Sequence, residues 1–157
     1  DGSEYAPLVQ GATTKRATTG LISRVGLATA LAASIEFLID GGGSNISART
    51  WGYLEVPFNA TLTKAVMLAD QTGSIIIDLW KCTYAQFDAG ATHPVAGDSI
   101  TGSAPPTITA ATKSQDTTLV GWTTTLAIGD ILAFQVPSAA TNITRVTLSL
   151  PLTRVVS

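Results

Sequence analysis

The stretch Ile35-Glu36-Phe37-Leu38-Ile39-Asp40-Gly41-Gly42-Gly43 decides the fold class of this chain. Its large apolar residues Ile35, Phe37 and Ile39 alternate with Glu36, Leu38 and Asp40, which is the two-residue period of a half-buried β-strand. The glycines that follow end the strand, because glycine adopts the backbone torsions that a tight turn needs. Short β-branched runs separated by Gly, Pro, Asp and Thr continue to Val156. This arrangement predicts an all-β sandwich or barrel.

Further strands are predicted wherever apolar residues alternate, or form a short run, between turn residues. These segments are residues 53–58, 62–68, 74–82, 117–122, 131–136 and 144–152. A long irregular connection runs from Tyr84 to about Ser114, with room for one short strand at Ser99 to Thr101. About seven to nine strands with one long crossing connection favour a two-sheet jelly-roll β-sandwich over an immunoglobulin-like fold or a lipocalin-like barrel.

The chain is expected to consist of an N-terminal arm and one β-sandwich domain. Residues 1–19 are rich in Gly, Thr and Ala and show neither helical nor strand periodicity, which is typical of an extended arm or linker. Residues 20–34 carry apolar residues at near-helical spacing, and Thr19 is a suitable N-cap, so a short helix is compatible with this segment. We therefore expect the arm over residues 1–34 and the sandwich over residues 35–157.

The composition bears on the partners of the domain. Hydrophobic residues make up 45% of the chain and charged residues only 13%, with a mean hydropathy of +0.32. So few charges favour a protomer that buries one face against copies of itself. The net charge is −2 and the basic residues are scattered, whereas a nucleic-acid binder gathers Lys and Arg on one face. No nucleic-acid partner is expected.

Membrane insertion is not expected either. The most apolar window, Leu21 to Ile39, contains Arg24 and Glu36, which leave about eleven uncharged residues between them. A membrane-spanning helix needs about 20 apolar residues. The single cysteine, Cys82, has no partner for an internal disulfide and lies in an apolar run, so we expect a small buried side chain there.

The sequence offers little material for catalysis or metal binding. It contains one His and one Cys, without the spacing of a zinc site or an EF-hand. Asp40, Asp70 and Asp130 lie at loop ends and could together bind calcium, although Asp is also a common turn residue. His93, the only candidate general base, lies beside Pro94 in a loop without a recognisable nucleophile motif. We therefore expect no catalytic, cofactor or metal site, and a protein that is not an enzyme.

Aromatic residues are the candidates for ligand binding or subunit contact. Trp51 and Tyr53 have the opposite parity from Leu54, Val56 and Phe58, so we expect them to point away from the core. Three roles are open for them: contact with another subunit, stacking on a glycan, or packing under the N-terminal arm. The long loop adds a recognition surface, because long loops on a rigid scaffold often carry function. Its expected residues are Tyr84, Gln86, Phe87, Asp88 and His93.

Several blocks of the sequence resemble β-sandwich domains of bacteriophage fibre and appendage proteins. The first is the stretch Ile35 to Ser44, followed by Leu54-Glu55-Val56-Pro57-Phe58. The later blocks are Ala69 to Lys81, Ile100 to Pro106, Leu119 to Thr123 and Gly129 to Phe134. Together they cover most of residues 35–150, whereas the segment before residue 35 matches no such block. The resemblance implies a trimeric jelly-roll head on a virion appendage, and it supplies no catalytic residue.

The expected function is that of a non-enzymatic structural protein of a phage virion. A homotrimer in a tail fibre, tail tip or spike would bind a glycan or protein on the host surface, and the N-terminal arm would contact other virion proteins. The first alternative is a capsid decoration protein, with residues 1–34 ordered only on the shell. The second alternative is a carbohydrate-binding module.

Overall fold

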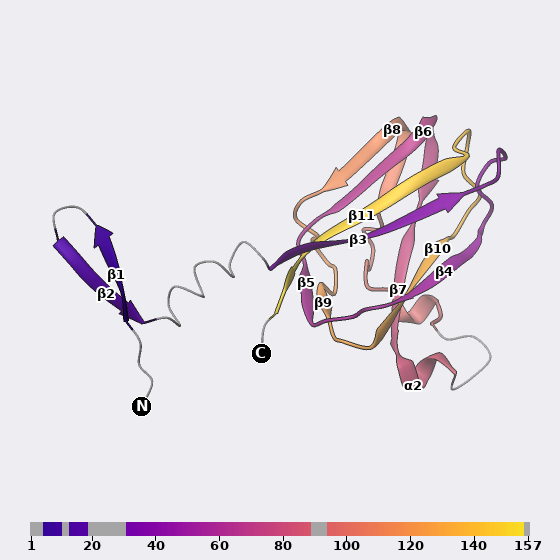
Figure 1. The fold of residues 1–157 in the computed structure, drawn as a ribbon. Helices are drawn as coiled ribbons and strands as arrows, with labels where there is room; N and C mark the ends of the chain where they lie inside the picture. Colours follow the sequence, from indigo (N-terminus) through magenta and orange to yellow (C-terminus); the bar gives the residue numbers. More distant parts are fainter. Residues whose placement is uncertain (1–4, 11–12, 19–30, 89–93, 156–157) are drawn as a thin grey trace. The chain divides into compact units, whose positions relative to one another are not determined.

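The computed structural model describes residues 5–10, 13–18, 31–88 and 94–155. The chain forms two compact units, Asp1–Ala32 and Ala33–Ser157 (Figure 1). Nearly all of the regular structure belongs to the second unit.

In the first unit, β1 (Tyr5–Gln10) and β2 (Thr13–Thr18) pair as an antiparallel hairpin. The sequence predicted an irregular arm here, because this segment has no apolar alternation that would signal a buried face. A hairpin is instead held by main-chain pairing, which needs no such alternation. The helix predicted over residues 20–34 lies mostly outside the described residues, but Ala32 already begins the next strand, so residues 32–34 are strand and not helix.

The second unit consists of two antiparallel sheets. The larger sheet contains β3 (Ala32–Asp40), β5 (Ala60–Leu62), β6 (Ala65–Ile76), β8 (Thr107–Asp116), β9 (Thr125–Leu126) and β11 (Arg145–Arg154). The smaller sheet contains β4 (Arg49–Glu55), β7 (Asp78–Thr83) and β10 (Asp130–Val136). Two short helical turns follow β7, namely α2 (Tyr84–Phe87) and the 3-10 turn η1 (Ala96–Asp98).

The strands of the sandwich pair in a nested order. The first strand, β3, pairs with the last, β11, and the second, β4, pairs with the last but one, β10. Between them, β6 pairs with both β11 and β8, and β7 pairs with β10. A single bridge from Trp80 to Ser99 stands where a further strand would extend the smaller sheet. Nested pairing across two sheets is the jelly-roll arrangement, so the predicted all-β jelly-roll sandwich is confirmed.

The two sheets are joined by a core in which the predicted alternation holds. Ile35 and Ile39 are buried on β3, and Phe37 between them stacks on Phe134 of the opposite sheet, with ring centroids 3.9 Å apart. Gly52 lies opposite Phe134 in the register of β4 and β10, and a Cβ atom there would come within 2.7 Å of the Phe37 ring. The remaining inward positions of β10 and β11 are also buried, as predicted: Leu132, Val136, Val146, Leu148 and Leu150.

The run Ser74 to Cys82, predicted as one strand, crosses from one sheet to the other. β6 of the larger sheet ends at Ile76, and β7 of the smaller sheet begins at Asp78. The residue between them, Ile77, is fully buried, and its N–H donates to the carbonyl of Pro106 at 3.0 Å. The run is apolar because it passes through the core at the corner of the sandwich.

Other sequence predictions in this region were wrong in detail. The turn predicted at Asp70 to Gly73 lies inside β6, where the pairing with β8 shifts register. Leu68 was predicted to be part of the apolar strand pattern, yet it is 54% exposed, whereas its neighbour Met67 is buried. The long irregular connection contains β8, whose Thr-rich sequence has few buried positions. No strand forms at residues 117–122, where Leu119 and Gly121 both have positive φ.

No helix in the described part of the chain is long and apolar enough to cross a membrane. Cys82 is buried, as predicted, and burial raises the pKa of its thiol, with a further increase from the carboxylates of Asp98 and Asp130.

The stacked ring of Phe134 should be the main anchor between the sheets. We expect Phe134→Ala to lower the free energy of unfolding by about 3–5 kcal/mol, because it removes a buried ring and leaves a cavity beside Phe37. Urea denaturation followed by circular dichroism measures the change. Val120→Ala is the matched control: its side chain is 74% exposed, and its loss should cost no more than about 0.5 kcal/mol. Equal effects of the two substitutions would contradict the assignment.

Candidate binding surface

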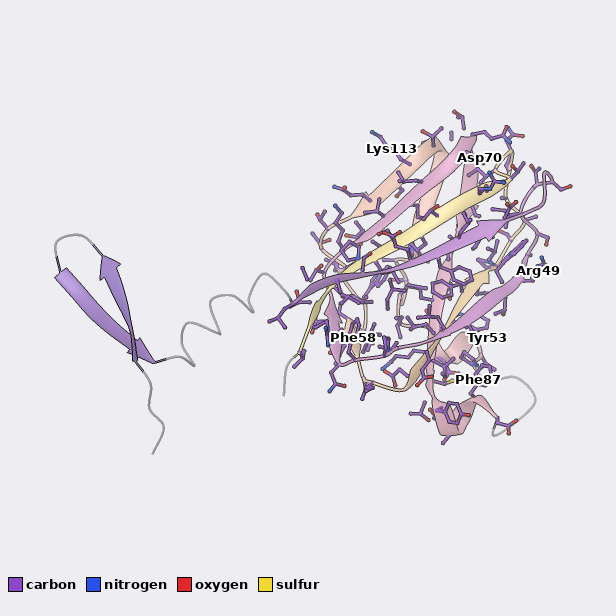
Figure 2. All side chains as sticks on the ribbon, in the orientation of Figure 1. Arg49, Tyr53, Phe58, Asp70, Phe87 and Lys113 are labelled. Carbon is purple, nitrogen blue, oxygen red and sulfur yellow. The ribbon has the colours of Figure 1, made fainter. Side chains whose placement is uncertain are left out.

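Two of the predicted binding residues, Tyr53 and Phe87, meet on the outer side of the smaller sheet. Their rings pack edge to face, with centroids 4.8 Å apart and planes at 82° (Figure 2). Tyr53 lies on β4 opposite Ala133 of β10, and Ala133 lies opposite Trp80 of β7. The chain leaves β7 directly into α2, so Phe87 reaches Tyr53 across the width of this sheet.

A capping box fixes α2 at the end of β7. The hydroxyl of Thr83 accepts from the N–H of Gln86 at 3.2 Å, and the side chain of Gln86 accepts from the N–H of Thr83 at 2.9 Å. These reciprocal hydrogen bonds hold a helix of only one turn, which would not be stable alone. The turn presents Tyr84, which is 72% exposed, three residues before Phe87. We call Tyr53, Tyr84 and Phe87 the aromatic patch.

The aromatic patch rests on a well-packed base. Ile131 and Cys82 are paired neighbours on β10 and β7, two residues from the row of Tyr53 in the same register, and both are buried although they face away from the inter-sheet core. α2 contacts both of these strands. Tyr53 therefore lies on a strand of the sheet, and Tyr84 and Phe87 lie on a helical turn that packs on the sheet. Less conformational entropy of the protein is then lost when a ligand binds.

Trp51 is separate from the aromatic patch. The pairing of β4 with β10 shifts register between Phe134 and Gln135, and such a bulge interrupts the side-chain alternation at this point of β4. Trp51 is half-buried against the core, its Nε1 donates to the carbonyl of Ser47 at 3.0 Å, and the guanidinium of Arg49 lies 3.8 Å above its ring. The cover of the Trp51 ring is thus Arg49, and the three roles open from the sequence stay predictions.

His93, the remaining predicted site residue, lies outside the described residues.

The three aspartates considered for calcium do not converge. Asp40 forms an ion pair with Arg145 at 2.8 Å, and Asp70 accepts hydrogen bonds from Thr144 and from the backbone N–H of Arg145. Asp130 belongs to a different cluster, where it pairs with Lys81 at 2.9 Å. Within the described residues, no group of three or more His, Cys, Asp or Glu side chains could hold a metal ion.

Asp40 and Asp70 instead tie three strands together at one end of the larger sheet. The hydrogen bond from the N–H of Gly42, followed by that from Arg145, lowers the pKa of Asp40. The hydroxyl of Thr144 and the N–H groups of Arg145 and Thr144 lower the pKa of Asp70. Sequence reasoning treated these residues as turn formers. It missed that the fold brings Asp40, at the end of β3, and Asp70, inside β6, beside the start of β11.

A second polar cluster lies between β7 and the segment that follows η1. One carboxylate oxygen of Asp78 accepts from the hydroxyls of Ser99 and Thr101, and the other accepts from Nε1 of Trp80 at 2.7 Å. All of these partners are part-buried or buried. Both carboxylate oxygens are engaged, so the cluster anchors the bridge from Trp80 to Ser99.

Comparison with known proteins identifies no family. No protein-family model matches the chain, and no curated protein matches it. Among solved structures, the chain is similar to RmlC from Streptococcus suis in complex with dTDP-D-xylose, with 11% sequence identity and a TM-score of 0.28. The match covers 98% of this chain and 63% of that one, so the chain spans less than two thirds of its length.

The expectation that the chain is not an enzyme requires correction. It rested on the absence of recognisable motifs, yet RmlC, a solved structure to which the chain is similar, is an epimerase. A β-sandwich fold is compatible with catalysis as well as with binding, so the fold gives no reason to exclude an activity. The low identity and TM-score, in turn, carry no activity or ligand over to this chain.

The hydrogen bonds that Asp70 accepts predict that the stability of the fold decreases in acid. Its folded pKa is lowered, so its contribution to stability is present above the unfolded value of about 3.9 and is lost as the pH falls through the folded pKa. We expect Asp70→Asn to lower the melting temperature at pH 7, and the gap from the wild type to narrow below about pH 4. Thermal melts between pH 7 and pH 2.5 measure this gap.

The matched control for Asp70→Asn is Glu55→Gln. Glu55 is exposed, and within the described residues its carboxylate has no hydrogen bond or ion pair. Its substitution should change the melting temperature little at any pH. A gap for Asp70→Asn that stays constant down to pH 2.5 would contradict the role of the ionised carboxylate.

Proposed function

We propose that this chain is a homotrimeric head domain of a phage virion appendage, such as a tail fibre, tail tip or spike, which attaches to the host surface through the aromatic patch. Two observations support this proposal. The sequence blocks of residues 35–150 resemble such head domains, and the chain folds as the jelly roll that this resemblance implies.

The single observation that carries the proposal is the edge-to-face pair of Tyr53 and Phe87. The ring of Tyr53 is 51% exposed and is held in one orientation by Phe87, while Tyr84 is exposed beside them on the same helical turn. Exposed tyrosines have an apolar ring and a polar hydroxyl, which suits contact with a sugar ring or with a protein surface. Aromatic anchors of this kind dominate the energy of many interfaces.

A capsid decoration protein is the second candidate, because the residues up to Ala32 form a compact unit of their own. Such a unit could bind the shell while the sandwich faces outward. Removal of residues 1–32 should then abolish binding to capsids and leave binding to host cells unchanged. The carbohydrate-binding module considered from the sequence differs only in its ligand, since the same tyrosines would stack on the glycan.

The attachment proposal predicts that the aromatic patch determines binding to cells. We expect Tyr53→Ala and Tyr84→Ala each to weaken binding of the labelled protein to bacterial cells by about tenfold or more, since loss of an anchoring ring costs about 2 kcal/mol. Flow cytometry over a panel of strains measures the change, and a glycan array tests whether the ligand is a sugar. Val120→Ala removes an exposed apolar side chain outside the aromatic patch and should have no effect. Unchanged binding by both tyrosine variants would contradict the proposal.

A further inference from the structure

The outer face of the larger sheet is the second exposed apolar surface of the sandwich. Leu38 on β3 and Leu68 on β6 are 55% and 54% exposed. Leu68 lies opposite Thr147 of β11 on one side and Lys113 of β8 on the other, so the surface continues across these strands. We call this surface the large-sheet face.

Leu38 belongs to the same face. Ser149 of β11 lies opposite Val66 of β6, and its hydroxyl donates to the carboxylate of Glu36 at 3.4 Å. Leu38 follows Glu36 by two residues on β3, and side chains two residues apart in a strand point to the same side. β3, β11, β6 and β8 lie side by side in that order in Figure 1.

The two halves of the large-sheet face are complementary in shape. At the β8 side there is a shallow hollow, lined by Val66, Leu68, Lys113, Ser114 and Gln115. At the β3 side, Leu38 projects with more than half of its side chain exposed. A leucine in a hollow lined partly by Val66 and Leu68 would remove apolar area of both from water.

The two halves are also complementary in charge. Glu36 lies on β3, and Lys113 lies on β8, with the polar uncharged residues Thr147 and Ser149 on the strand between them. Lys113 extends from the edge of the sheet in Figure 2, and among the described residues its ammonium has no ion pair or hydrogen bond. Opposite charges at opposite edges of one face cannot meet within one copy, but they can meet between two.

We propose that the large-sheet face is the contact between copies of this chain. The β3 half of one copy packs on the β6 and β8 half of the next, with Leu38 in the hollow and Glu36 beside Lys113. Because the halves differ, a closed ring of copies satisfies every contact, as closed symmetry requires. This inference rests on the self-assembly in the proposed function, but not on attachment to a host.

The size of the face sets how much surface the contact covers. Four strands about 4.8 Å apart give a width of about 19 Å, and a nine-residue strand such as β3 is about 30 Å long. In a closed ring each copy gives one half of this face to each of two neighbours, so each contact removes about 300 Å² from each of its two copies, and each copy loses about 600 Å² in all. A second copy brings a leucine to the hollow and a carboxylate to the ammonium of Lys113.

The experiment measures mass by light scattering on the full chain at about 10 μM. The wild type is expected to be an oligomer, and Leu38→Asp and Leu68→Asp are each expected to shift the mass to that of a monomer, with unchanged circular dichroism. Val120→Asp introduces the same charge at an exposed apolar position elsewhere and should leave the oligomer intact. A monomeric wild type, or an oligomer that survives both leucine substitutions, would overturn the proposal.

A charge exchange identifies the pair across the contact. Glu36→Lys and Lys113→Glu are each expected to raise the dissociation constant of the oligomer at least about tenfold, and the double variant is expected to recover most of that loss. Losses that simply add in the double variant would show that these residues do not meet. Binding to cells is measured separately with Tyr53→Ala, so a failure of the attachment proposal leaves this test unaffected, and the reverse also holds.

Discussion

The stacked rings of Phe37 and Phe134 are the contact on which the sandwich depends. One ring comes from β3 in the larger sheet and the other from β10 in the smaller sheet, so the pair fixes the distance between the two layers. It is possible only because Gly52 has no side chain where the Phe37 ring lies. Phe134 lies on the middle strand of the smaller sheet, Phe37 lies on β3 beside β11, and the buried leucines, isoleucines and valines of both sheets pack around them. A rigid inter-sheet distance gives both outer faces a defined shape.

Both proposals place function on the outer faces of the sandwich. On the smaller sheet, the crossing at Ile77 sends the chain from one layer into the other, and the capping box at Thr83 then folds it back over β7 and β10. The aromatic patch is the result of this path. On the larger sheet, no helix of the described chain covers β3, β11, β6 and β8, and the exposed leucines remain at the surface. In the two proposals made above, one face binds a foreign ligand and the other binds a second copy of the chain.

Some elements could be read from local sequence because one face of a strand is buried. The period of two in Ile35 to Asp40, and again in the strands β10 and β11, gave both the strands and their inward positions. β8 could not be found in this way, since Thr, Ala and Ser at an edge leave no strong apolar signal. The bulge beside Trp51 could not be predicted either, because a register shift depends on the partner strand. Parity along the strand predicted that Trp51 points away from the core, but it packs against the core at this bulge.

The sequence by itself determined the class of fold, the buried positions of the long strands and the exposure of Tyr53, because burial follows from alternation along one strand. Only the tertiary structure decided which of these residues meet. Tyr53 and Phe87 are brought together by the pairing of β4 and β7 with β10, and Glu36 and Lys113 are placed at opposite sides of one face by the strands between them. Such neighbours are far apart in the chain, and their proximity depends on strand order and register, which no local pattern specifies.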